Sequence, residues 1–139
     1  YRCLDCVQGG YFCLTCIAST HQANPLHHVQ RWDYVEWKDS SLKDLGVSIK
    51  LGHNSAKCPN VVDGTFDLNL LDISGVHYLR LNSCACPNTT DYRELLRLRW
   101  AALTPFDLRY AVSFDLIEGF LKKNYESHIS YRDYLAQVL

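Results

Sequence analysis

Apolar and polar side chains alternate along two neighbouring stretches in the middle of the chain. Phe66, Leu68 and Leu70 are the apolar positions of the first stretch, and residues 76–81 form the second. A period of two is typical of a half-buried strand. Ile73-Ser74-Gly75 lies between the stretches and has the composition of a turn. The pattern therefore predicts a β-hairpin.

The second half of the chain changes to a helical period. Asp91 and Glu94 have the spacing of an N-cap and its reciprocal partner, so we expect a helix that runs through Leu98. Two further helices are predicted where apolar residues recur every three or four positions: Phe114, Ile117, Leu121 and Tyr125, then Tyr131, Tyr134, Leu135 and Val138.

Three shorter elements are predicted in the first half of the chain. Residues 11–13 favour a short strand and residues 14–19 a helical turn. The alternation over residues 47–51 favours another strand, which leads to His53. Together with the hairpin and the helices, these elements predict an α+β fold.

Composition places the chain among ordinary globular domains. Of its 139 residues, 47% are hydrophobic and 21% are charged. Its apolar runs are too short to span a bilayer, and no secretory signal is visible. The formal net charge of -1 offers no long-range attraction to nucleic acid or membrane, so DNA binding would need a local basic patch. Because methionine is absent and the chain starts at Tyr1, we expect a piece of a longer protein.

The clearest chemical signal is the spacing of the seven cysteines. Two Cys-x2-Cys pairs and two downstream histidines occur near the start: Cys3, Cys6, Cys13, Cys16, His21 and His27. Two residues between paired cysteines let both thiolates reach one zinc ion about 2.3 Å away. A disulfide framework would leave one of seven thiols over, whereas histidines complete the shells of a metal framework. The segment therefore predicts structural zinc.

Two ways of sharing these ligands remain open. In one, the four cysteines bind a single ion and both histidines are bystanders. In the other, a cross-brace, Cys3 and Cys6 bind one ion together with His21 and His27. We favour the cross-brace because both histidines lie at ligand spacing. The second cysteine pair then needs two further ligands from outside this chain.

The other three cysteines predict a separate zinc site. Cys84-x-Cys86 is a tight pair at the end of the predicted hairpin, and Cys58 lies upstream, five positions after His53. Three thiolates leave a tetrahedral shell one ligand short, so we include the histidine. The fold expected is thus a small zinc-stabilised α+β module with a β-hairpin and C-terminal helices, holding two zinc ions.

Several motifs occur together along nearly the whole chain. They are Tyr1-Arg2-Cys3-Leu4-Asp5-Cys6, Cys13-x2-Cys16, His21, Asn24-Pro25-Leu26-His27, Trp32, Ser41-Leu42-Lys43-x-Leu45-Gly46, Leu51-Gly52-His53, Cys58-Pro59, and Asp72-Ile73-x-Gly75-Val76-His77 before Cys84-x-Cys86. In this combination they resemble the cysteine-cluster domain associated with fungal KDZ transposases. In that family the cluster lies N-terminal to a ribonuclease-H-like transposase domain encoded by a mobile element.

The resemblance has three implications for this chain. A further Cys-x2-Cys pair would precede Tyr1, complete a third zinc site with Cys13 and Cys16, and make this segment similar to a B-box zinc module. The catalytic domain of the parent transposase would lie beyond Leu139. The protein of such an element is expected to be intracellular and nuclear.

We expect three segments. A B-box-like zinc module, incomplete at its N-terminus, covers residues 1–38. A β-hairpin region with the second zinc site covers residues 39–90, and a helical segment covers residues 91–139.

Enzymatic activity is not expected from these residues. Cysteine-rich zinc shells are closed, and neither a partnered general base nor a carboxylate cluster for Mg²⁺ is visible in the sequence. The expected function is a structural zinc-binding accessory domain of a KDZ-type transposase that aids DNA recognition at the transposon ends, or assembly. Basic residues of the helical half would make the DNA contacts: Arg93, Arg97, Arg99, Lys122 and Lys123. The alternative is a B-box-like module for protein–protein interaction or self-association. Neither a membrane nor a small-molecule substrate is expected as a partner.

Overall fold

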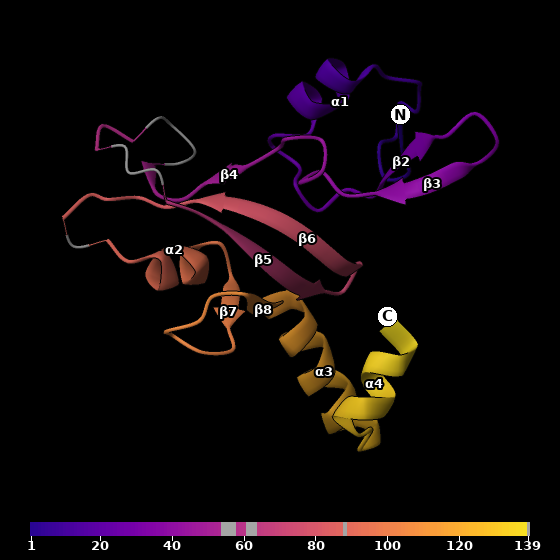
Figure 1. Cartoon of the computed structure of the whole chain (residues 1–139). Helices are drawn as coiled ribbons and strands as arrows, with labels where there is room; N and C mark the ends of the chain where they lie inside the picture. Colours follow the sequence, from indigo (N-terminus) through magenta and orange to yellow (C-terminus); the bar gives the residue numbers. More distant parts are fainter. Residues whose placement is uncertain (54–57, 61–63, 88, 139) are drawn as a thin grey trace.

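The computed structural model describes residues 1–53, 58–60, 64–87 and 89–138 (Figure 1). Two sheets organise these residues: an antiparallel sheet with the order β1-β2-β3, and a mixed sheet with the order β4-β6-β5-β8-β7. Figure 1 shows the N-terminal sheet and α1 on one side of the β5–β6 hairpin, with α3 and α4 extending from the opposite side. The predicted α+β class is confirmed.

The elements have these bounds: β1 Arg2–Cys3, α1 Leu14–Thr20, β2 Val29–Trp32, β3 Trp37–Ser40, β4 Ile49–Lys50, β5 Thr65–Asp72, β6 Gly75–Asn82, α2 Asp91–Arg97, β7 Trp100–Ala102, β8 Tyr110–Ser113, α3 Phe114–Ser127 and α4 Tyr131–Val138. The division into three segments stays a prediction, and β3 spans the boundary expected between the first and second segments.

A small apolar core holds the N-terminal sheet, with Ile17 of α1 and Val29 of β2 almost completely buried. The helical turn predicted over residues 14–19 is confirmed as α1. The strand predicted over residues 11–13 is wrong, because Cys13 is the N-cap of that helix. Its sulfur accepts a hydrogen bond from the backbone N–H of Cys16 at 3.4 Å, so Cys13 caps the start of a helix and does not belong to a strand.

The predicted hairpin is confirmed as β5 and β6, which pair from Thr65↔Asn82 to Asp72↔Gly75. One face of the hairpin carries the main core, where Leu68, Leu70 and Leu81 are at most 1% exposed. The alternation seen in the sequence is therefore the alternation between a core-facing and a solvent-facing side.

The segment for which the sequence predicts only helices also supplies two strands. β8 pairs in parallel with β5, and β7 pairs antiparallel with β8. Ala111, Val112 and Ser113 are consecutive and all buried, so β8 has no alternating pattern to reveal it. Helix α2 is capped by Thr90, whose side chain accepts from the backbone N–H of Arg93, and not by Asp91 as predicted.

Helices α3 and α4 pack against each other and against β5 and β8 of the large sheet. Leu116 and Tyr134 are buried there with Val112 of β8. The predicted cap of α4 is confirmed, since Ser130 accepts from the backbone N–H of Asp133 at 3.2 Å. Among the described residues, no helix combines the length and the apolar character needed to cross a membrane.

Candidate metal centres

The first cluster gathers Cys3, Cys6, His21 and His27, whose donor atoms all lie within 4.8 Å of one another. The sulfur of Cys6 is 3.4 Å from Nε2 of His21 and 3.4 Å from Nδ1 of His27. The sulfur of Cys3 is 3.5 Å from the same His27 nitrogen. The structure thus brings together the four side chains of the cross-brace arrangement.

Local structure aims the His21 ring at this cluster. His21 is the C-cap of α1 and is 1% exposed. Its Nδ1 lies 2.9 Å from the carbonyl oxygen of Ile17 and 3.0 Å from the hydroxyl of Thr20. A proton on Nδ1 donated to that carbonyl leaves Nε2 as a free donor atom facing Cys6, which is the orientation that metal-ligating histidines use.

The second cluster gathers His53, Cys58, Cys84 and Cys86, again within 4.8 Å of one another. Sulfur–sulfur distances are 3.7 Å from Cys58 to Cys84 and 3.6 Å from Cys58 to Cys86. Nε2 of His53 is 3.1 Å from the sulfur of Cys86 and 3.4 Å from that of Cys84. The cluster joins the segment after β4 to the segment after β6.

A tight backbone turn presents the histidine of the second cluster. Gly52 and His53 both have left-handed backbone angles, with φ of 73° and 50°. A Cβ atom on Gly52 would lie 3.2 Å from the sulfur of Cys84, so only glycine fits this approach without displacement. On the other side, the hydroxyl of Thr89 donates to the carbonyl oxygen of Cys86 at 2.5 Å and holds the cysteine turn.

The thiols of the second cluster influence one another's ionisation. A hydrogen bond from the backbone N–H of Cys86 lowers the pKa of Cys84 to about 7. Burial and the neighbouring thiols of Cys58 and Cys84 raise the pKa of Cys86 to about 11. Three thiolates side by side repel one another, so a divalent cation at their centre would stabilise the fully ionised set.

Both clusters have the dimensions of a tetrahedral thiolate–imidazole shell. Four donors about 2.0–2.3 Å from a central zinc ion are separated by roughly 3.3–3.8 Å. Six of the seven donor–donor distances given above lie at 3.4–3.7 Å and agree with this geometry. Each cluster supplies four protein donors, so each is able to hold a metal ion with no coordination position left for substrate.

The remaining cysteine pair stands apart from both clusters. Cys13, the N-cap of α1, and Cys16 in its first turn are both exposed, and within the described ranges they belong to no group of three or more potential ligands. A hydrogen bond with the hydroxyl of Thr15, followed by the interaction with Cys16, lowers the pKa of Cys13 to about 7. The same contact with Cys13 raises the pKa of Cys16, so Cys13 is the thiol of the pair that ionises more readily.

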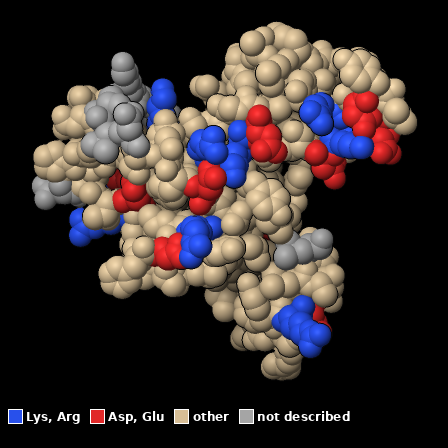
Figure 2. All heavy atoms as spheres, in the orientation of Figure 1, with Lys and Arg blue, Asp and Glu red and all other residues tan. Residues whose placement is uncertain are grey.

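The basic residues proposed to contact DNA differ in their surroundings. Arg97 pairs with the buried carboxylate of Glu94, and Arg99 lies 2.8 Å from Glu118 and 3.3 Å from Asp115. The other three have no carboxylate partner among the described residues: Arg93, Lys122 and Lys123. Figure 2 shows Lys and Arg interspersed with Asp and Glu over the visible face, without a broad basic patch.

Two histidines to which the sequence analysis assigns no role as ligands meet between the N-terminal sheet and β6. The rings of His28 and His77 are 4.9 Å apart. Nδ1 of His28 is 2.9 Å from Asp5, and Nε2 of His77 is 2.8 Å from the hydroxyl of Ser74. Neither histidine has a cysteine partner at ligand spacing in the sequence, so the spacing argument that identifies the metal ligands does not reveal this contact.

Comparison with known proteins identifies the larger part of the chain. The family model described as CxC2 like cysteine cluster associated with KDZ transposases matches residues 42–139, which include the whole second cluster. No curated protein and no solved structure matches the chain significantly. Since the match covers well over half of its residues, the chain belongs to the CxC2-like cysteine clusters associated with KDZ transposases.

Proposed function

We propose that this chain is a non-catalytic accessory module of a KDZ transposase, in which two zinc ions hold the fold together so that the module supports assembly of the protein. The observation that carries the proposal is the pair of four-donor clusters, each of which joins segments distant in sequence. The first joins Cys3 to His27, and the second joins His53 to Cys86. A nuclear location belongs to the same proposal.

A structural role fits the clusters better than a catalytic one. Catalytic zinc has three protein ligands and an open position for water, whereas four protein donors close the shell. Zinc is favoured as the metal because mixed thiolate and imidazole donors at tetrahedral spacing suit it. Each ion would supply on the order of 10–16 kcal/mol of apparent binding free energy, which is comparable to or larger than the roughly 5–15 kcal/mol by which whole domains are stable.

Metal content tests this proposal directly. Native mass spectrometry of the purified chain should show two zinc ions, and Cys84→Ser should remove one of them and unfold the β5–β6 region. Hydrogen exchange of the amides in residues 65–82 measures that unfolding. Cys13→Ser is the matched control, because its exposed sulfur belongs to neither cluster, and it should keep both ions. A protein that is folded without metal, or whose thiols form disulfides, would contradict the proposal.

DNA recognition is the second candidate function. Its support is that Arg93, Lys122 and Lys123 have no carboxylate partner in the part of the chain that the structure describes. The carboxylates beside Arg97 and Arg99 instead compete with phosphate for those two guanidinium groups. With three phosphate contacts, log K for duplex DNA should fall with log salt at a slope of about −2.7, using about 0.9 per contact.

Binding titrations at several salt concentrations decide between these candidates. The triple substitution Arg93→Gln, Lys122→Gln, Lys123→Gln should abolish the salt dependence if DNA is bound as described. Lys38→Gln serves as the control, because Lys38 is paired with Asp33 at 2.7 Å on the N-terminal sheet. Absence of DNA binding together with concentration-dependent association would leave assembly as the function, and a slope much steeper than about −2.7 would mean a larger basic surface.

A further inference from the structure

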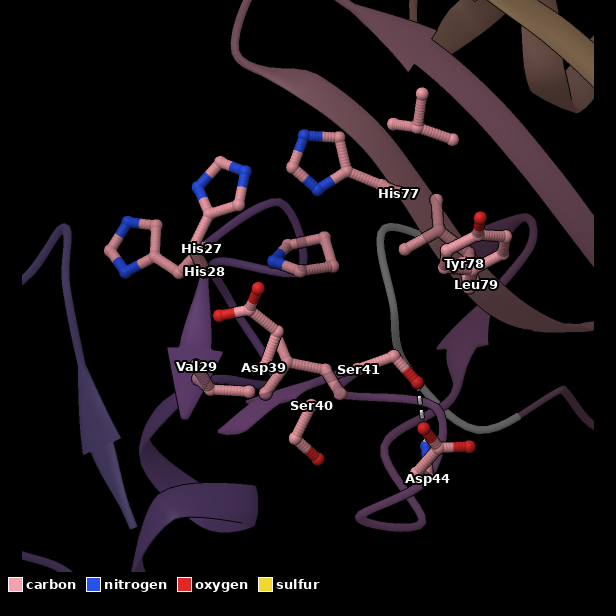
Figure 3. Close-up of a pocket in the computed structure, with 13 residues that line it drawn as sticks. His27, His28, Val29, Asp39, Ser40, Ser41, Asp44, His77, Tyr78 and Leu79 are labelled. Atoms are coloured by element: carbon pink, nitrogen blue, oxygen red, sulfur yellow. Dashed lines mark hydrogen bonds between the residues drawn. The ribbon is translucent and has the colours of Figure 1, made fainter. Parts of the chain in front are cut away.

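A groove of about 430 Å³ runs between the N-terminal sheet and β6 (Figure 3). Its β6 wall consists of the four consecutive residues 76–79, and its opposite wall includes Val29 and residues 39–42. Successive side chains of a strand point to opposite faces of the sheet. Four consecutive lining residues therefore mean that the groove follows the edge of β6.

The register of the sheet shows that this edge is open. β5 pairs with β6 along its whole length, but β4 pairs only with Leu81 and Asn82. The carbonyl oxygen of Asn82 accepts from the backbone N–H of Leu51 at 3.0 Å, so the polar backbone groups of Asn82 point toward β4. The backbone N–H and C=O groups of a strand point to alternate edges at successive residues. Those of Tyr78 and Val76 therefore point to the same edge as those of Asn82, beyond the end of β4.

These backbone groups form a ready template for another strand. Among the described residues, no strand pairs with the outer edge of Val76 or Tyr78, and no other backbone hydrogen bond reaches them. An extended segment laid along the edge would continue the line of β4 and satisfy them. Strand addition of this kind provides affinity through main-chain hydrogen bonds, and neighbouring pockets provide specificity.

The charges of the groove select the side chains of that segment. Asp39 and Asp44 line the groove, and neither has a cationic partner in the part of the chain that the structure describes. Asp39 accepts from the side-chain amide of Gln30 at 2.8 Å. Of the described residues that line the groove, none is a lysine or an arginine. A basic side chain on the added strand would therefore find unpaired carboxylates.

We propose that this groove binds an extended segment of a partner protein, about four to five residues long and carrying lysine or arginine, which adds to β6 as a new strand. The length follows from the open stretch between Val76 and Arg80 at about 3.3 Å per residue. The inference rests on the proposed assembly function and names the surface and the class of partner that it uses.

Hydrogen exchange and peptide binding test the inference on the metal-loaded chain. In the free protein, the amides of Val76 and Tyr78 should exchange at least about tenfold faster than those of His77 and Leu79, which point toward β5. The probe is an acetylated hexapeptide of alternating valine and lysine. It should slow exchange at Val76 and Tyr78, and leave His77 and Leu79 unchanged.

Two matched peptides separate strand addition from other binding. The version with glutamate in place of lysine should bind about tenfold more weakly, and the version with N-methyl groups on alternate amides should not bind. Asp39→Asn should weaken the lysine probe, whereas Asp107→Asn, whose carboxylate pairs with Arg109 outside the groove, should not.

The inference is overturned if the N-methylated peptide binds as well as the parent, or if the amides of Val76 and Tyr78 are already protected in the free protein. It is also overturned if metal-loaded, folded protein ignores the lysine probe. These results would leave the metal-held scaffold intact, because that proposal depends on metal content and on unfolding after metal loss, which are measured separately.

Discussion

A single glycine controls how closely the turn after β4 approaches the second cluster. Gly52 has φ of 73°, and an added Cβ would lie 3.2 Å from the sulfur and 3.3 Å from the Cβ of Cys84. Gly52→Ala should therefore combine backbone strain of about 1–2 kcal/mol with overpacking of about 1–3 kcal/mol. Denaturant unfolding of the metal-loaded protein measures this loss, and zinc titration should show weaker binding at the second cluster.

Gly46→Ala is the control for backbone strain alone. Gly46 has φ of 80°, but an added Cβ meets no heavy atom within 4 Å. This variant should lose only about 1–2 kcal/mol and keep its metal affinity. If both alanine variants lose the same free energy of unfolding, the approach of Gly52 to Cys84 has no energetic consequence.

Helices α3 and α4 depend on another glycine where they pack together. An added Cβ on Gly119 of α3 would collide with the hydroxyl of Tyr134 on α4, which is 4% exposed and confined by Phe120. Alanine normally stabilises a helix by about 1 kcal/mol relative to glycine. We expect Gly119→Ala to destabilise the protein instead, by about 1 kcal/mol, because overpacking outweighs propensity.

Removing the hydroxyl that causes the collision should reverse this effect. In the background of Tyr134→Phe, Gly119→Ala should be neutral or stabilising, since the ring carbon nearest to the added Cβ is 3.5 Å away. Thermal unfolding of the four proteins in this double-mutant cycle measures the coupling. Additive effects would mean that α4 moves away without cost.

At the scale of the whole molecule, polar contacts join the N-terminal sheet to the larger one. Lys43, in the turn after β3, lies 2.8 Å from Asp67 of β5, and Asp67 also pairs with Arg80 of β6. Exposed ion pairs of this kind stabilise by at most about 1 kcal/mol each. The contact between His28 and the buried His77 is the other part of this junction.

Because the junction contains the buried His77, we expect the stability of the protein to depend on pH. Burial, followed by the nearby His28, lowers the pKa of His77, while Asp72 and Asp5 oppose this shift. A histidine whose neutral form is favoured in the fold takes up its proton first in the unfolded chain, near a pH of about 6.5. The free energy of unfolding should therefore fall as the pH decreases below about 6.5.

Denaturant unfolding at saturating zinc between neutral pH and about pH 5.5 measures this dependence. His77→Gln, which retains a partner for the hydroxyl of Ser74, should reduce the pH dependence. His128→Asn is the control, because His128 is exposed and asparagine tolerates its left-handed backbone. If the two substitutions change the slope equally, His77 is not the source.

Local patterns along the chain predict most of the helices, the hairpin and the second donor set, and they give the first donor set as one of two alternatives. The alternation at Leu68 and Leu70 reports directly which face of β5 is buried, because side-chain direction in a strand depends only on position. The Cys-x2-Cys and Cys-x-Cys spacings identify paired cysteines as metal ligands for a similar reason, since two donors so close in sequence can face one ion. The helical period likewise located α3 and α4.

Contacts between distant segments settled what those patterns leave open. β8 is buried on both faces, beside β5, so its sequence carries no alternating period. The sequence predicts Arg99 as a DNA contact, but in the fold its guanidinium group pairs with Glu118 of the next helix. The open edge of β6 exists because β4 is only two residues long. Such pairings depend on which segments meet in space, and that is a property of the packed molecule rather than of any stretch of the chain.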